Sequence, residues 1–244
     1  MTTVSTDKAK AALGGLYPHL AERGGPADAP RDALRLDAAL REAMVAKWRD
    51  SVVVKSRFFE TRGNDVLRAA HMLADSYRGG GRLYTMGNGG SSCDAAHVAV
   101  EFQHPVTAGR PALPACNLAQ DMAMLTAVGN DVGFAEVYAR QMPGLVRAGD
   151  VVLGVSTSGN SANVLRGLES AHELGARTLA LVGGDGGAMA RSASVELSLL
   201  VDSDSIHRIQ ETHVAIYHVL WDLVHSLLAD DRPARAAAPT RKSP

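Results

Sequence analysis

Residues 82–92 read RLYTMGNGGSS and show the unit from which the fold of this chain is built. A short apolar run ends at Met86 and leads into glycines and serines that precede a predicted helix. Glycines let a backbone approach a ligand closely, and a new helix offers unpaired N–H groups at its positive end. An ordinary turn with Ser91 or Ser92 as a helix N-cap is the other interpretation. Both interpretations predict a strand, a turn and a helix.

The same unit recurs along the chain. Short apolar runs begin at 113 (LPACNL), 150 (DVVLGVS), 177 (RTLALVG) and 195 (VELSLLV). Helical patterns separate them, near 92–104, 121–129, 134–147, 161–175, 186–192 and 206–229. Strands that alternate with helices form parallel sheets, and such sheets bind ligands at the carboxyl ends of their strands. We therefore predict an α/β fold, a doubly wound five-stranded parallel sheet of the flavodoxin-like kind.

Two helical patterns precede this sheet. Apolar residues recur at three and four spacing from Asp32 to Asp50, and a second pattern covers 63–79, which together predict an N-terminal helical hairpin. Trp48 lies on the first apolar stripe, so core packing is its expected role. The composition further predicts a flexible extension over 1–31, one folded domain over 32–229 and a flexible basic tail over 230–244.

Bulk composition excludes several classes of function. The chain is 46% hydrophobic and 21% charged, as in ordinary globular proteins, and its formal net charge of −1 gives it no electrostatic reason to bind nucleic acid or an anionic membrane. Its start lacks a basic stretch followed by an apolar run, and no stretch approaches the ~20 apolar residues that span a bilayer. The two cysteines form no CxxC pair. We expect a cytoplasmic protein.

A second loop follows the strand DVVLGVS. Residues 156–161, STSGNS, bring four hydroxyls, from Ser156, Thr157, Ser158 and Ser161, to the start of another predicted helix. Hydroxyls and free N–H groups at a helix N-terminus can surround a dianionic phosphate without a lysine. A capping loop in which only Ser161 matters is the simpler alternative, but it requires fewer hydroxyls than the loop has. We predict a phosphate site here.

Four collinear motifs resemble the phosphoheptose isomerases of the sugar isomerase (SIS) family. They are GNGGSSCDAAHVAVE at 87–101, LTAVGNDVGF at 125–134, GDVVLGVSTSGNSANVL at 149–165 and RIQETHVAIYH at 208–218, and the resemblance covers about residues 50–229. It implies an enzyme that converts sedoheptulose 7-phosphate to D-glycero-D-manno-heptose 7-phosphate through an enediol. It also implies a homotetramer.

The resemblance implies roles for particular residues. The substrate phosphate would be bound by Ser156, Thr157, Ser158 and Ser161, and the sugar would be contacted or shaped by Asn88, Gly89, Gly90, Glu101, Asn130, Asp131 and Gln210. Zinc, one ion per site, would be bound by His97, Glu101, Gln210 and His218. Glu101 and His218 would also act as the acid and base groups.

The spacing of these residues can be compared with the chemistry. His97 and Glu101 are four residues apart and share one helix face, which suits a joint metal or substrate contact but also an ordinary surface pair. Gln210 and His218 are eight residues apart, an axial rise of roughly 12 Å on an ideal helix. Either both reach one site in a single chain or a neighbouring subunit supplies one of them. A structural role is the alternative for each.

Two further residues lie near these motifs. Asp94 suits either the orientation of a histidine or a first-turn acid that complements the helix dipole. Cys93 is expected to be a small buried thiol.

One departure from the family pattern bears on the substrate. Residues 102–105 are Phe-Gln-His-Pro, where phosphoheptose isomerases carry a stretch resembling Leu-x-Gly-Arg. The missing arginine leaves open an isomerase of another ketose phosphate. The non-enzyme alternative is a binding or regulatory SIS protein, like the relative that assembles a replication initiator on DNA. That relative lacks the acid of the His-x-x-x-Glu pair and the last histidine, whereas this chain has Glu101 and His218.

Overall fold

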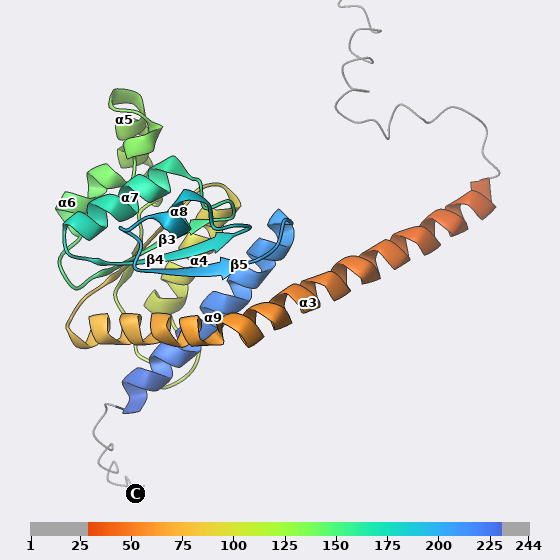
Figure 1. Cartoon of the computed structure of the whole chain (residues 1–244), viewed down its shortest axis with the longest axis horizontal. Helices are drawn as coiled ribbons and strands as arrows, with labels where there is room; N and C mark the ends of the chain where they lie inside the picture. The colour runs from red at the N-terminus through yellow and green to blue at the C-terminus, as the bar shows by residue number, and fades with distance from the viewer. Residues whose placement is uncertain (1–28, 231–244) are drawn as a thin grey trace, which may run out of the picture. The chain divides into compact units, whose positions relative to one another are not determined.

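The computed structural model describes residues 29–230 (Figure 1). Within them, five strands form a parallel sheet in the order β2-β1-β3-β4-β5. The strands are β1 (Leu83–Gly87), β2 (Ala115–Asn117), β3 (Val151–Ser156), β4 (Arg177–Gly183) and β5 (Leu197–Val201). All five lie where the apolar runs predicted them, so the predicted α/β fold is confirmed.

The strand order determines where a ligand can bind. The chain passes from β1 outward to β2 and then returns to β3 on the other side of β1, so the order reverses between β1 and β3. These two strands pair from Leu83 with Val151 to Gly87 with Val155. Their carboxyl ends therefore lie side by side. Parallel sheets bind ligands at such a switch point, and both predicted loops follow it.

The helices are α3 (Ala29–Arg78), α4 (Gly90–Gln103), α5 (Met122–Asp131), α6 (Met142–Leu145), α7 (Ala162–Glu173), α8 (Gly187–Arg191) and α9 (Ile206–Asp230), with the short 3₁₀ turns η1 (Phe134–Glu136) and η2 (Ala139–Gln141). The predicted helix over 134–147 is thus divided into three pieces. Pro143 stands in the first turn of α6, where its missing N–H costs nothing.

The predicted N-terminal hairpin is wrong, because α3 is one continuous helix. No proline interrupts residues 50–62, and Val54 and Phe58 are buried and continue the apolar stripe to Val66. Gly63 stands inside the helix, where a single glycine costs only about 1 kcal/mol. Trp48 also differs from expectation, since it is 64% exposed.

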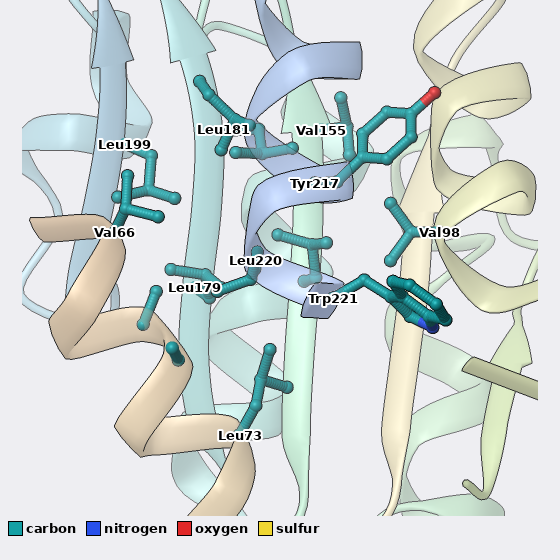
Figure 2. Close-up of a cluster of buried hydrophobic side chains, with 14 of the residues drawn as sticks. Val66, Leu73, Val98, Val155, Leu179, Leu181, Leu199, Tyr217, Leu220 and Trp221 are labelled. Carbon is teal, nitrogen blue, oxygen red and sulfur yellow. The ribbon is translucent and has the colours of Figure 1, made fainter. Parts of the chain in front are cut away.

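Apolar side chains cover both faces of the sheet. On one face, α9 and α4 pack on the strands beside the second half of α3 (Figure 2). Tyr217, Leu220 and Trp221 of α9 lie at the centre of this cluster. On the other face, α7 and α8 contribute Leu168 and Met189 to a second cluster. The sheet is therefore doubly wound, as predicted.

The chain divides into two compact units, residues 1–49 and 50–244. The sheet and helices α4 to α9 lie in the second unit. The predicted limits of the folded domain, 32–229, remain a prediction, and the segments 1–31 and 230–244 lie almost entirely outside the described residues. Over residues 29–230, none of the helices is both long and apolar enough to cross a membrane.

Candidate active site

The glycine loop, residues 87–92, follows β1 directly. Gly89 is the N-cap of α4 and has φ 54° and ψ −126°, a conformation that side-chain-bearing residues avoid. No side chain caps this helix. The interpretation of Ser91 or Ser92 as its N-cap is therefore wrong. Tyr138 donates a hydrogen bond to the Gly87 carbonyl oxygen and holds the end of β1.

The serine loop, residues 156–161, follows β3. Ser161 occupies the N-cap position of α7, yet its side chain makes no capping bond. Its Oγ lies instead 2.9 Å from Ser156 Oγ. Gly159 has φ 63°, and a Cβ there would collide with the Gly186 carbonyl group. The loop therefore gathers its hydroxyls rather than using Ser161 as a cap, which favours the phosphate interpretation over the capping one.

Ser158 and Thr157 line the mouth of a hollow beside the serine loop. The hollow is also bordered by residues 183–185 at the end of β4, by Ser203 and Asp204 after β5, and by the first turn of α9. Ser158 Oγ accepts a hydrogen bond from the Asn160 N–H at 3.2 Å. The hydroxyls of Ser156, Ser158 and Ser161 are thus held by local hydrogen bonds at the carboxyl edge of the sheet.

Two asparagines join the loops. Asn88 Nδ2 donates to Asn163 Oδ1 at 2.7 Å, and Asn163 Nδ2 donates to Asn88 Oδ1 at 2.9 Å. Asn163 lies in the first turn of α7 and is 3% exposed. Sequence reasoning missed it, although it stands only two residues after Ser161. This reciprocal pair fixes the glycine loop relative to the start of α7.

His97, Glu101 and His218, which we call the His–Glu cluster, meet between α4 and α9. Each offers one ligand atom, and these atoms all lie within 4.8 Å of one another. His97 Nε2 lies 3.1 Å from Glu101 Oε1, and the rings of His97 and His218 are 5.1 Å apart at a steep angle. The sequence left open whether a neighbouring subunit supplies Gln210 or His218. In the structure, His218 lies with His97 and Glu101 of the same chain.

Two aromatic residues of α9 contact residues of the His–Glu cluster. The Tyr217 hydroxyl lies 2.8 Å from His97 Nδ1, and Trp221 Nε1 donates to the Glu101 carbonyl oxygen at 2.8 Å. Trp221 is 9% exposed and packs in the core. Tyr217 was missed by sequence reasoning, and its position next to His218 is the signal that would have drawn attention to it.

Gln210 does not join the His–Glu cluster in the single chain. A Cβ at Gly90 would collide with the Gln210 amide, so this side chain lies against the start of α4. His218 meets α4 at His97, seven residues further on, an axial distance of roughly 10 Å. The two α9 residues therefore contact α4 about two turns apart, as their eight-residue separation requires.

Asn130 and Asp131 end α5, which stands out from the rest of the sheet domain in Figure 1. Asn130 Nδ2 donates to Asp131 Oδ1 at 2.8 Å, and Asp131 is exposed. The serine loop and the glycine loop lie at the β1–β3 switch point, and the His–Glu cluster lies further along α4.

Asp94 and Cys93 differ from their expected environments. Asp94 belongs to the second turn of α4, because this helix begins at Gly90, and it is 8% exposed. Burial raises its pKa to about 6, and nearby His97 acts in the opposite direction. It is therefore no solvent-facing first-turn acid. Cys93 is exposed, so the expected buried thiol is wrong.

An arginine from further along the chain, Arg110, contacts the tryptophan that bonds to the Glu101 backbone. The Arg110 guanidinium carbon lies 4.4 Å from the centroid of the Trp221 ring, and Arg110 forms an ion pair with Asp222. Trp221 in turn bonds to the Glu101 backbone. Arg110 therefore helps to hold Trp221 in place, and Trp221 contacts the end of α4.

Comparison with known proteins identifies the class. The SIS domain family matches residues 48–183. The phosphoheptose isomerase of Aquifex aeolicus (strain VF5) is 40% identical over 183 residues, which cover 75% of this chain and 95% of the relative. Among solved structures, the phosphoheptose isomerase of Neisseria gonorrhoeae has a TM-score of 0.71 at 36% identity and is covered over 99% of its length, with 77% of this chain.

A second solved structure agrees. The phosphoheptose isomerase from Francisella tularensis has a TM-score of 0.72 at 33% identity, over 76% of this chain and 97% of that protein. These similarities extend over nearly the whole of each relative. The chain belongs to the phosphoheptose isomerase family of SIS-domain proteins.

Proposed function

We propose that this chain is an aldose–ketose isomerase that converts sedoheptulose 7-phosphate to D-glycero-D-manno-heptose 7-phosphate. Glu101 and His218 carry the proposal, because a carboxylate of α4 and an imidazole of α9 meet in one chain. A purely binding SIS protein has no need of this acid–base pair. The family membership and the gathered hydroxyls of the serine loop support the same conclusion.

The serine loop is the proposed phosphate site. Ser156, Thr157, Ser158 and Ser161 bring their hydroxyls to the N-terminus of α7, where the helix dipole favours an anion. Ser156 and Ser161 already lie within hydrogen-bond distance of each other. A dianionic phosphate would be bound by neutral donors alone, so it would be held by geometry rather than by a lysine.

The proposed reaction moves a proton between C1 and C2 through an enediol. In our proposal Glu101 removes a proton from the carbon and returns it to the neighbouring carbon, while His218 moves protons on the hydroxyl and carbonyl oxygens. Asn88, Gly89, Gly90, Asn130, Asp131 and Gln210 remain proposed sugar contacts. The exchange consumes no cofactor and no water, so its atoms balance within the sugar.

Zinc is the proposed metal, one ion per site. The donor set suits it, because two imidazoles and a carboxylate within 4.8 Å match the nitrogen and oxygen ligands of catalytic zinc. When bound, such an ion polarises a carbonyl group and stabilises negative charge on oxygen. His97, Glu101 and His218 would hold it in this chain, and Gln210 remains a proposed fourth ligand. Glu101 would then share its oxygens between metal and proton transfer.

We further propose a homotetramer in the cytoplasm. Exposed apolar side chains support the assembly, because soluble monomers rarely leave such stripes uncovered. On α3, Leu34, Leu40, Met44 and Trp48 are each at least 58% exposed. Phe134, the first residue of η1, is 65% exposed. Light scattering should give four chains per particle, and an active monomer would contradict this part of the proposal.

The decisive experiment identifies the sugar. Purified full-length protein is incubated with sedoheptulose 7-phosphate and, in parallel, with shorter ketose phosphates, and aldose formation is followed by NMR. We expect conversion of the seven-carbon substrate to exceed that of the others. Faster conversion of a shorter ketose phosphate would identify a different isomerase. No conversion of any of them, with binding retained, would favour the regulatory alternative.

A further inference from the structure

His97 is held at both of its ring nitrogens. Nε2 faces Glu101 Oε1 at 3.1 Å, and Nδ1 faces the Tyr217 hydroxyl at 2.8 Å. Tyr217 is 2% exposed, and its ring stands between α9 and α4 with the hydroxyl on the side of α4 (Figure 2). The packing of this ring in the core leaves its hydroxyl little freedom to move away from His97.

This arrangement determines which nitrogen of His97 carries the proton. A neutral imidazole has one N–H donor and one acceptor. When the Tyr217 O–H donates to Nδ1, the proton of His97 lies on Nε2 and points at Glu101. When Nε2 instead binds a cation, the proton must lie on Nδ1, and the Tyr217 oxygen accepts it. A hydroxyl can take both roles without moving its oxygen.

We propose that Tyr217 is a positioning residue that sets the tautomer and ring orientation of His97 for cation binding. The inference rests on the proposed metal site of the His–Glu cluster and is independent of which sugar is the substrate. It assigns a role to a residue that neither touches the substrate nor binds the metal.

Tyr217→Phe tests the proposal, because it keeps the packed ring and removes only the hydroxyl. Tyr84→Phe is the matched control, since Tyr84 is also buried and loses a hydroxyl bond, to the Leu145 carbonyl oxygen. Zinc affinity of the full-length apo-protein is measured by competition with a chromogenic chelator. We expect Tyr217→Phe to bind zinc about 10-fold more weakly or worse, and Tyr84→Phe to bind it as the wild type does.

A second measurement is independent of zinc and of activity. Long-range ¹H–¹⁵N spectra of protein labelled at histidine report the tautomer of His97, whose signals are assigned by their loss in His97→Asn. The zinc-free wild type should show the proton on Nε2, and Tyr217→Phe should show a mixture of tautomers. If the wild type bound no zinc, the proposed metal site would fail, and this spectrum would decide the role of Tyr217 alone. Wild-type zinc affinity and an unchanged tautomer in Tyr217→Phe would overturn the proposal.

Discussion

The serine loop and the His–Glu cluster are built in different ways. The serine loop is a run of consecutive residues, 156–161, between β3 and α7, and its bonds are local. The His–Glu cluster joins α4 to α9, which are far apart in the chain, and it exists only because both helices pack on the same face of the sheet. Binding of a phosphate can therefore be specified locally, whereas the reacting groups depend on the whole core.

The largest expected effect is the loss of chemistry. Glu101→Gln and His218→Asn should each reduce turnover by about 100-fold or more, because each removes a positioned acid–base group. The double variant should be little worse than either single one, since the two act as a unit. Steady-state rates with sedoheptulose 7-phosphate measure this. His207→Asn is the control, because His207 is exposed on the same helix. Full turnover in Glu101→Gln would contradict the assigned mechanism.

The serine loop should affect binding rather than chemistry. Replacement of Ser158 and Ser161 by Ala removes two hydroxyl donors and should weaken binding of sugar phosphate by about 10-fold or more, since hydrogen bonds to charged groups contribute about 1.5–3 kcal/mol each. Calorimetric titration of the catalytically inactive Glu101→Gln background measures Kd without turnover. Ser226→Ala is the control, because this serine bonds only to the Asp222 backbone on α9. Unchanged affinity would reduce the loop to a structural turn.

Mixing of subunits distinguishes local from shared parts of the site. Glu101 and His218 lie together in one chain, so refolded mixtures of Glu101→Gln and His218→Asn should stay inactive. Asp131 is the last residue of α5 and is exposed. If it reaches the site of a neighbour, a mixture of Glu101→Gln and Asp131→Ala should regain about a quarter of wild-type activity, as random pairing across an interface predicts. Recovery by the first mixture would mean that the cluster is shared between chains.

The smallest expected effect concerns His213, a histidine of α9 that is buried in the core and lies outside the His–Glu cluster. Burial lowers the pKa of His213 to about 4, whereas the unfolded chain has the ordinary value near 6.5. Between about pH 6.5 and pH 4, His213 is protonated in the unfolded chain but neutral in the folded protein. The free energy of unfolding should thus fall by about 1 kcal/mol between pH 7 and 5.5 through this group. Urea unfolding at both pH values measures it, and His213→Gln should lose this part of the dependence. The same slope in the variant would assign it elsewhere.

Local patterns in the amino-acid sequence determine much of this protein by themselves. The apolar runs marked all five strands, because a buried parallel strand must be apolar along its whole length. The serine loop and the His97–Glu101 pair could likewise be predicted, since their geometry is set within a few residues of one strand or helix. The continuity of α3 could not be predicted in this way, because residues 50–63 are as compatible with a helix as with a turn. The burial of Val54 and Phe58 decides between the two.

Only the tertiary structure decided which distant groups meet. The eight-residue separation of Gln210 and His218 did not determine which residues they contact. The packing of α9 along α4 places Gln210 against Gly90 and His218 in the His–Glu cluster. The same packing places Tyr217 against His97 and Trp221 against the Glu101 backbone. A helical pattern tells which side chains share a face but not which neighbour that face contacts, because the contact depends on the order of strands and the crossing of helices.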